Sequence, residues 1–330
     1  MTAPTIGVDV GGTRIKAGVL DAAGQILDRL TRPTEPLAAD AEDAIVAVVE
    51  DLIARHRGRL EGAAAPNGGD IQDIAAVGIG AAGFVDAARG VVVFAPHLSW
   101  RDEPLRERIA SRLSLPVVVD NDANAACWAE HLHGAGRGAA HLVMVTLGTG
   151  IGGAHLVDGE LRRGQHGLAG EYGHLLLVPD GRACECGNTG CWEQYASGTV
   201  MRRRAQEVVR RGGVYAERLR QACDGQPERL EGEDVTRLAR AGDPASVELL
   251  AEVGRWLGLG LANLAAALDP GAFVVGGGAS EAGDLLLEPA RAALARQLAG
   301  RGHRPVPPVY AAHLGVDAGL VGAAQLARVG

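Results

Sequence analysis

The stretch Thr5-Ile-Gly-Val-Asp-Val-Gly-Gly-Thr-Arg-Ile-Lys16 joins a short apolar segment to a glycine turn and the start of a second apolar segment. Ile15 to Leu20 and Gln25 to Thr31 continue the pattern, with turn residues Asp21 to Gly24 between them. Apolar runs separated by glycine and Asp-Gly-type turns are typical of antiparallel strands. The sequence therefore predicts a β-meander at the start of the protein.

The same pattern recurs in the second half of the chain. His141 to Leu147 is an apolar run, Gly148 to Gly153 is glycine-rich, and Ala154 to Val157 is apolar before Asp158-Gly159. This glycine run also matches the dinucleotide fingerprint GxGxxG, but that motif requires a helix after the glycines, and here a strand is expected. Two copies of strand, glycine turn and strand predict two similar α/β lobes that arose by duplication.

Further apolar segments extend each lobe. Strands are expected at 74–80, 117–119 and 272–275, and helices from Asp40, at 253–268 and at 318–327. We expect a smaller lobe at 1–120, completed by 314–330, and a larger lobe at 121–313 with a ligand cleft between them. The arginine-rich region 201–241 is expected to be a solvated helical excursion, and 61–70 a surface loop.

Composition excludes several classes of protein. The net charge of −8 argues against nucleic-acid binding, which requires a basic face. No run of 18 apolar residues occurs, so no membrane span is expected. The N-terminus lacks the pattern of a signal peptide and the cysteine count of five is odd, which favours the reducing cytoplasm.

A cluster of potential metal ligands lies between Gly170 and Glu193. His174, Cys184, Cys186 and Cys191 supply one imidazole and three thiolates, the ligand set of a closed structural zinc site. The alternative is three reduced thiols in a glycine-rich loop. A zinc ion would fix the segment that carries the carboxylates of Glu171 and Glu193.

The glycine turns are candidates for phosphate binding. Asp9-x-Gly11-Gly12-Thr13 and Thr146-Leu-Gly148-Thr149-Gly150 expose backbone N–H groups and hydroxyls that can bind phosphate. A third glycine run occupies 276–278, and a Walker loop is absent. The only lysine of the chain, Lys16, could contact phosphate, although a solvated strand residue is the simpler interpretation.

Five motifs in order resemble the ROK family of sugar kinases. They are Asp9-Val-Gly-Gly-Thr-Arg-Ile-Lys16, Asn121-Asp-Ala-Asn-Ala-Ala126, Thr146-Leu-Gly-Thr-Gly-Ile-Gly-Gly153, Gly170-Glu-x-Gly-His174 and Cys184-x-Cys-Gly-x-x-Gly-Cys-x-Glu193. They span nearly the whole chain, and within the family the similarity is greatest to ATP-dependent glucokinases of the actinobacterial type. The resemblance implies an actin-like ATPase (ribonuclease H-like) α/β fold, and a homodimer or homotetramer.

The resemblance also implies the roles of individual residues. Asp122 would be the catalytic base in phosphate transfer from ATP to the 6-hydroxyl of glucose, with Mg²⁺ at the phosphates. The sugar would be bound by Gly83, Asn121, Glu171, His174 and Glu193. ATP would be bound by Asp9, Gly11, Gly12, Thr13, Lys16, Thr146, Gly148, Thr149, Gly150, Gly277 and Gly278. His174 and the three cysteines would hold structural Zn²⁺.

Several alternatives remain at this point. Asn121 or Asp122 could simply cap the helix that follows. The chain reads Ala82-Gly83 where the family usually has Pro-Gly, and Pro96-His97-Leu98-Ser99-Trp100 where it commonly has Asn-Leu before the tryptophan. N-acylmannosamine, mannose or fructose could therefore be the substrate, and polyphosphate the donor. A sugar-sensing protein without activity is the non-enzymatic alternative; ROK-like repressors add an N-terminal winged helix, for which no room is expected before Thr5.

Overall fold

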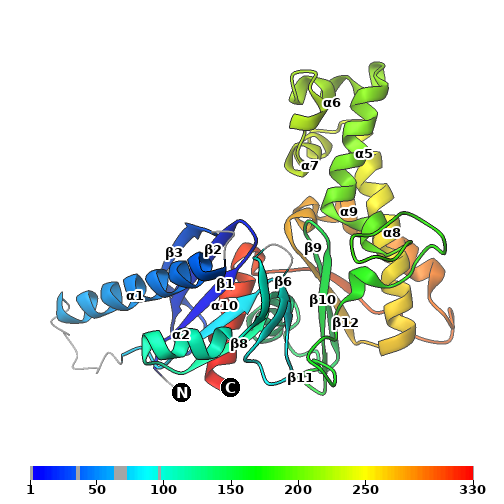
Figure 1. Cartoon of the computed structure of the whole chain (residues 1–330). Helices are drawn as coiled ribbons and strands as arrows, with labels where there is room; N and C mark the ends of the chain where they lie inside the picture. The colour runs from blue at the N-terminus through cyan, green and yellow to red at the C-terminus, as the bar shows by residue number, and fades with distance from the viewer. Residues whose placement is uncertain (1–2, 35–37, 63–72, 96–97, 330) are drawn as a thin grey trace. The chain divides into compact units, whose positions relative to one another are not determined.

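A computed structural model of the chain describes residues 3–34, 38–62, 73–95 and 98–329 (Figure 1). It forms two compact units, each built on a five-stranded sheet. The first unit comprises Met1–Arg137, Leu161–Ala169 and Val316–Gly330, and the second comprises Gly138–Glu160 and Gly170–Gly315. The expected division between 120 and 121 falls inside β8 (Val117–Asn121), a strand that belongs entirely to the first unit.

The sheet of the first unit has the strand order β3-β2-β1-β4-β8. Its strands are β1 (Thr5–Val10), β2 (Arg14–Leu20), β3 (Ile26–Pro33), β4 (Ala76–Ala81) and β8 (Val117–Asn121). β1 pairs antiparallel with β2 and parallel with β4, which confirms the predicted meander and places Asp9 opposite Lys16. Ile6, Val8 and Val10 are fully buried, so the apolar run predicted as a strand forms part of the core.

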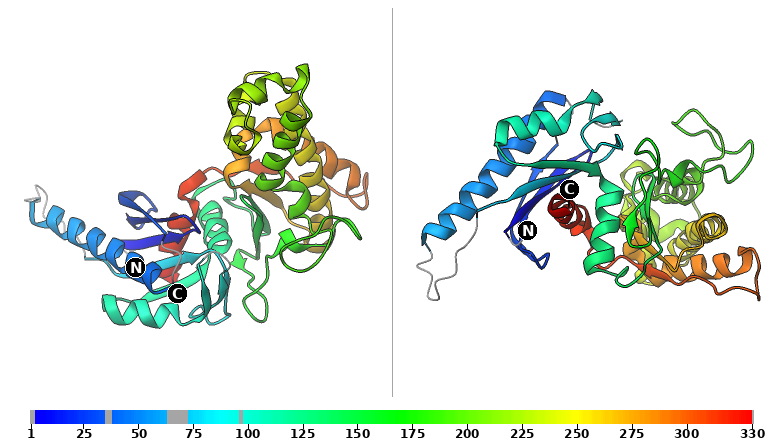
Figure 2. Two further views of the ribbon diagram at one scale, coloured as in Figure 1. Left: turned by 45° about the horizontal axis from the view of Figure 1, so that its top comes forward. Right: turned by 90° about the horizontal axis from the view of Figure 1, so that it is seen from below.

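The C-terminal helix α10 (Ala318–Val329) packs on this sheet through glycines (Figure 2). A Cβ atom at Gly7 of β1 would lie 1.9 Å from the carbonyl oxygen of Leu320, and one at Gly78 of β4 would lie 1.8 Å from that of Ala323. Real Cβ atoms do not approach so closely, so any larger residue would push the helix off the sheet. These glycines explain how the last residues of the chain complete its first unit.

The remaining elements of the first unit flank the sheet. The helices are α1 (Ala38–Gly62), α2 (Leu105–Leu113) and α3 (Asp122–His133), and a small sheet contains β5 (Phe84–Val85), β6 (Val92–Ala95) and β7 (Trp100–Glu103). The small sheet was not predicted from the sequence, and its strands are only two to four residues long. Helix α1 extends through Gly62, so the first two residues of the surface loop predicted at 61–70 are helical, and the rest of that range lies outside the described residues.

The sheet of the second unit repeats the order of the first, as β11-β10-β9-β12-β13. Its strands are β9 (Leu142–Leu147), β10 (Ile151–Val157), β11 (Glu160–Leu161), β12 (Ala272–Gly276) and β13 (Val309–Ala311). β9 pairs antiparallel with β10 and parallel with β12, as β1 does with β2 and β4. The equal order agrees with the predicted duplication. Because a strand follows Gly148 to Gly150, the dinucleotide fingerprint is accidental, and this strand begins at Ile151 rather than at Ala154.

The helices of the second unit include the arginine-rich region. They are α4 (Glu193–Ala196), α5 (Gly198–Arg211), α6 (Glu217–Ala222), α7 (Gly232–Arg240), α8 (Pro244–Leu268) and α9 (Asp284–Gln297). The prediction that 201–241 is helical is confirmed, but the region is solvated on one side only: Met201, Val209, Leu219 and Val235 are buried in the same apolar core as α8. The arginines occupy the outer faces of amphipathic helices, and composition alone concealed the apolar faces.

No helix within the described ranges combines the length and apolar character needed to cross a membrane.

Candidate active site

The start of α3 in the first unit holds Asn121 and Asp122 in a hydrogen-bonded turn. The Oδ1 atom of Asn121 accepts from the backbone N–H groups of Ala123 and Asn124, at 2.8 and 3.2 Å, so Asn121 is the N-cap of the helix. Its Nδ2 donates to the carbonyl oxygen of Gly83 at 3.0 Å. The capping role considered for Asn121 or Asp122 therefore falls to Asn121, and Asp122 is the first helical residue.

Gly83 has a packing role of its own. A Cβ atom there would lie 2.6 Å from the carbonyl oxygen of Phe94 in β6. The small sheet that the sequence analysis missed thus fixes the position of Gly83, and through Gly83 the side chain of Asn121. His97, which differs from the family pattern, lies outside the described residues.

The first glycine hairpin carries a carboxylate at the end of β1. The side chain of Asp9 is 21% exposed, and its Oδ2 lies 3.9 Å from Nζ of Lys16. Lys16 also donates to the carbonyl oxygen of Val316 at 3.2 Å, so it links β2 to the segment before α10. Burial raises the pKa of Asp9, and the positive charge of Lys16 opposes this shift.

Gly319 allows Asp9 to lie against the first turn of α10. A Cβ atom at Gly319 would be 2.7 Å from Cγ of Asp9. Gly319 could not be recognised from the sequence, because a glycine inside an apolar helix carries no local signal of such an approach. In the turn that follows, Gly11 is half-buried and its N–H donates to the carbonyl oxygen of Arg14 at 3.1 Å, whereas Gly12 and Thr13 are exposed to a ligand.

The second glycine hairpin lies between β9 and β10 in the second unit. Its turn is closed by the N–H group of Gly148, which donates to the carbonyl oxygen of Gly150 at 3.1 Å. A Cβ atom at Gly150 would lie 2.4 Å from Oε2 of Glu193, so this glycine admits the carboxylate. Thr149 is exposed and Thr146 is half-buried at the end of β9.

Two glycines near this hairpin have open space around them. A Cβ atom at Gly148 or at Gly278 would meet nothing within 4 Å, and neither residue has a positive φ. The fold therefore does not require glycine at these positions. By contrast, Gly277 has a φ of +83°, and a Cβ atom there would lie 2.4 Å from the carbonyl oxygen of Leu147. That contact brings the turn after β12 next to the hairpin.

Three predicted sugar-binding residues come together in the second unit. His174 lies 3.7 Å from Glu193 and 3.9 Å from Glu171, measured from its ring nitrogens to the carboxylate oxygens. Burial raises the pKa of Glu171; His174 opposes this shift and the negative charge of Glu193 adds to it. Two carboxylates and an imidazole at one place can accept and donate hydrogen bonds to the hydroxyls of a polar ligand.

Glycines also position the segment that carries Glu171 and His174. A Cβ atom at Gly170 would lie 2.3 Å from the carbonyl oxygen of Gly153, and one at Gly173 would lie 2.3 Å from that of Ile151. The segment therefore packs directly on the backbone of β10. The spacing of the motif Gly170-Glu-x-Gly-His174 sets two glycines against the strand and presents the polar side chains between and beyond them.

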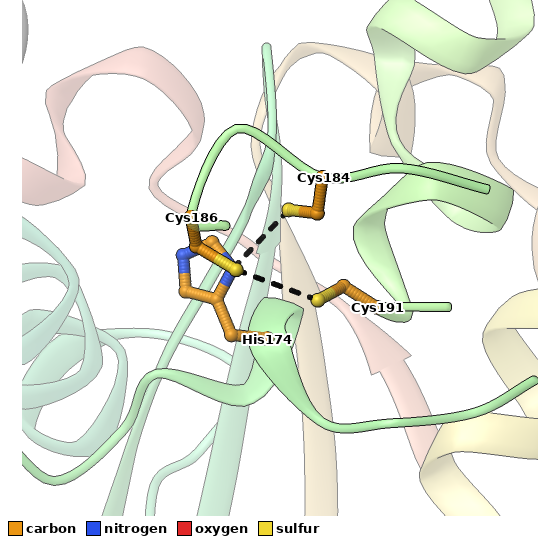
Figure 3. A group of neighbouring side chains, drawn as sticks. All are labelled: His174, Cys184, Cys186 and Cys191. Carbon is orange, nitrogen blue, oxygen red and sulfur yellow. Dashed lines mark hydrogen bonds between the residues drawn. The ribbon is translucent and has the colours of Figure 1, made fainter. Parts of the chain in front are cut away.

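The ligand atoms of His174, Cys184, Cys186 and Cys191 lie within 4.8 Å of one another (Figure 3). Sγ of Cys186 is 3.6 Å from Sγ of Cys191, and Sγ of Cys184 is 3.7 Å from Nδ1 of His174. A tetrahedral zinc ion with Zn–S bonds of 2.3 Å separates its sulfur ligands by about 3.8 Å. The donor set and spacing thus fit a four-coordinate metal. Burial raises the pKa of the Cys184 thiol to about 12, and this thiol donates to Glu193 at 3.1 Å.

Comparison with known proteins identifies the architecture as the actin-like ATPase fold of sugar kinases. A ROK glucokinase from Streptomyces griseus, solved in complex with glucose and AMPPNP, superposes with a TM-score of 0.88 at 47% identity, covering 99% of this chain and all of that one. The ROK hexokinase from Thermus thermophilus gives a TM-score of 0.75 at 33% identity, covering 99% and 98% of the two chains. The fold predicted from the sequence motifs is confirmed.

The sequence comparisons agree with the structural ones. The ROK family profile matches residues 5–329. The glucokinase of Streptomyces coelicolor is 48% identical over 324 residues, which covers 98% of this chain and 97% of the relative. The chain belongs to the ROK family.

Proposed function

We propose that this protein is an ATP-dependent glucokinase, which transfers the terminal phosphate of ATP to the 6-hydroxyl of glucose. The observation that carries the proposal is the hydroxyl-binding group of Glu171, His174 and Glu193 in a chain that is similar to glucokinases over nearly its whole length. A vicinal diol of a sugar can donate two hydrogen bonds to one carboxylate, which suits this group.

Asp122 is proposed as the base that takes the proton of the 6-hydroxyl. A sugar hydroxyl is a weak nucleophile, and a carboxylate within hydrogen-bond distance accepts its proton while the oxygen attacks phosphorus. A new O–P bond forms to the sugar oxygen and the bond from phosphorus to the bridging oxygen of ADP breaks, with ADP as the leaving group. The N-cap at Asn121 supports this role because it fixes the backbone on both sides of Asp122.

The remaining predicted residues would bind sugar and nucleotide. In the first unit, Asn121 and the backbone of Gly83 would bind sugar hydroxyls. The two glycine hairpins would bind the phosphates through N–H groups and the hydroxyls of Thr13 and Thr149. The open space at Gly148 and Gly278 supports nucleotide binding there, because neither backbone conformation nor packing explains these glycines. The carboxylate of Asp9 fits a Mg²⁺ ion, which would neutralise phosphate charge.

The metal group would hold structural Zn²⁺. His174, Cys184, Cys186 and Cys191 complete a shell of four ligands, which leaves no position for an activated water. The ion would fix the loop that carries Glu193. It would also orient His174, so that the second ring nitrogen is available to a sugar hydroxyl.

The test is a coupled assay of the purified protein with a panel of hexoses and phosphate donors. We expect glucose with Mg·ATP to give the highest kcat/KM. A higher kcat/KM for N-acetylmannosamine, mannose or fructose would show that this sugar, and not glucose, is the substrate. A higher value with polyphosphate than with ATP would show that polyphosphate is the donor. Absence of phosphorylation with every pair, despite tight sugar binding by calorimetry, would favour a sugar sensor.

A further inference from the structure

The residue before the Asn121-Asp122 pair is a buried carboxylate that organises the start of α3. Asp120 is 2% exposed. Its Oδ1 atom accepts from the backbone N–H of Asn121 at 2.9 Å and from Nδ2 of Asn124 at 2.9 Å. One oxygen of Asp120 thus binds residues on both sides of Asp122.

The other oxygen of Asp120 is held by Arg163. Nε and Nη2 of Arg163 donate to Oδ2 at 2.9 and 2.6 Å, so two of the guanidinium's N–H donors meet on one carboxylate oxygen. A buried carboxylate that lost this partner would keep its negative charge only at a large cost in desolvation. Arg163 therefore holds in place the Asp120 carboxylate on which the turn at Asn121 depends.

Arg163 reaches Asp120 from a distant part of the sequence. It lies in the segment Leu161–Ala169, which belongs to the first unit although the residues before and after it belong to the second. Gly167, with a φ of +85°, allows this segment to pack on β5, because a Cβ atom there would lie 2.4 Å from the carbonyl oxygen of Val85. The N–H of Ala169 donates to the carbonyl oxygen of Arg163 at 3.0 Å and closes the loop.

We propose that Arg163 is a positioning residue for the reaction: through Asp120 it fixes the backbone of Asn121 and thereby the direction of the Asp122 carboxylate. This inference rests on the proposed function of Asp122. Arg163 acts on the orientation of the base rather than on the substrate, so its loss should lower kcat and leave the KM for ATP little changed. A displacement of about 1 Å at a reacting group can cost about 100-fold in rate.

A purely structural ion pair is the alternative, and the same unit offers a matched control. Arg108 lies 2.9 Å from Glu103 and 3.4 Å from Glu42, whose carboxylates are also nearly buried, on elements away from α3. Arg108→Met removes an arginine from buried carboxylates just as Arg163→Met does. If both arginines only stabilise the fold through their ion pairs, both variants will have a lower melting temperature and the kcat of the wild type.

The kinetic experiment compares Arg163→Met, Arg163→Lys and Arg108→Met with wild type under saturating glucose. We expect kcat to fall about 100-fold in Arg163→Met, to recover in part in Arg163→Lys, and to stay near wild type in Arg108→Met. Arg163→Lys keeps a positive charge beside Asp120 but lacks the planar guanidinium with its two N–H donors. It therefore also serves as the variant that folds if Arg163→Met does not. Wild-type kcat in a folded Arg163→Met or Arg163→Lys would overturn the proposal, as would an equal loss in Arg108→Met.

A second readout is independent of catalysis. Hydrogen–deuterium exchange at the amides of residues 121–124 should speed up in both Arg163 variants and not in Arg108→Met. Unchanged exchange at these amides would overturn the proposal even if kcat fell. If the wild type phosphorylates no sugar of the panel, the proposed function fails, while the exchange data still decide whether Arg163 fixes this turn.

Discussion

The two units fix their predicted sugar-binding residues in different ways. In the first unit, Asn121 and Asp122 stand at the start of α3 and are held by hydrogen bonds from the chain itself, to Gly83, Asn124 and Asp120. In the second unit, Glu193 follows the ligand Cys191 closely in sequence, and the His174 ring belongs to the metal group. The first arrangement is complete in the folded chain, and the second would depend on the proposed ion.

This difference separates the expected effects of substitutions. Changes near Asp122 should act on the chemical step and appear in kcat. Changes in the metal group should act on the binding of sugar and on the stability of its loop, and appear in KM and melting temperature. The distinction would be contradicted if both kinds of change lowered kcat and raised the KM for glucose to the same extent.

The largest effect is expected for Asp122→Asn. The substitution preserves size and the acceptor for the N–H of Ala123, at 2.9 Å from Oδ1, but removes the basic charge. General-base catalysis contributes about 100- to 10,000-fold, so kcat should fall at least about 100-fold while the affinity for glucose stays within about tenfold. Steady-state kinetics measures kcat, and calorimetry measures the affinity for glucose.

Glu130→Gln is the control for Asp122→Asn, because it removes a carboxylate at the other end of the same helix. Glu130 is fully buried and accepts from the N–H of Ala135 at 2.7 Å, so its substitution tests stability without touching the proposed base. Turnover of Asp122→Asn above about one-tenth of wild type would show that Asp122 is not the base.

The next largest effect is expected for Cys186→Ser. Loss of one thiolate should release the ion, lower the melting temperature and raise the KM for glucose by about 10- to 100-fold, the usual range for disturbance around a metal site. The KM for ATP should change little, because the glycine hairpins do not use the metal ligands. Elemental analysis of wild type and variant measures the zinc directly.

Cys223→Ser is the matched control for Cys186→Ser. Cys223 is buried in the core of the second unit, where its thiol donates to the carbonyl oxygen of Leu219 at 3.3 Å, outside the metal group. It should retain zinc and the wild-type KM. Active wild-type enzyme without bound zinc would refute the assignment of the metal.

The sequence predicted the local elements well where the pattern is short-range. Both glycine hairpins, the helix after Asp122 and the candidate metal ligands follow from alternation, turn residues and spacing that act within some twenty residues. The structure brings together the four ligands, and also Glu171 with Glu193, as their spacing indicated. The ordered motifs predicted the family and fold, which the comparisons confirmed.

The features that the sequence did not reveal are contacts between distant residues. Arg163 is one of many arginines in the chain, and nothing in its neighbourhood marks it as the partner of Asp120. Gly319 lies about 310 positions from Asp9, and its close approach is visible only once α10 is placed on the sheet. The core of the region 201–241 was missed for a similar reason: its apolar faces are defined by α8, which they contact.

A smaller, selective effect is expected for Gly148→Val, which tests the second hairpin. A side chain there meets open space in the folded protein, so stability should not change. It should obstruct a phosphate that approaches the backbone. Loss of one hydrogen bond to a charged group costs about 1.5–3 kcal/mol, which is tenfold or more in KM for ATP.

Gly58→Val is the control for Gly148→Val. Gly58 in α1 also has open space around it, and it lies outside both glycine hairpins. Neither KM should change in this variant. A rise in the KM for glucose equal to that for ATP in Gly148→Val would indicate a general disturbance rather than a blocked phosphate site.

The smallest effect is expected for Asp9→Asn, whose stability should rise while its activity falls. Burial raises the pKa of Asp9 in the folded protein above the ordinary value of 3.8, so the fold favours the protonated, neutral form. Compared with a variant that has a neutral side chain at position 9, the wild type is therefore equally stable below pH 3.8. It becomes less stable than that variant as the pH rises through the raised pKa. Asn is neutral throughout, so Asp9→Asn should melt about 2 °C higher than wild type at neutral pH, with the difference fading as the pH approaches 4.

Activity should fall, because the carboxylate proposed to bind Mg²⁺ is lost. Thermal unfolding across a pH series measures the difference, and Asp43→Asn, at an exposed position of α1, should show no such trend. A melting temperature of Asp9→Asn below wild type at neutral pH would mean that the ion pair with Lys16, at 3.9 Å, outweighs the cost of burying the carboxylate.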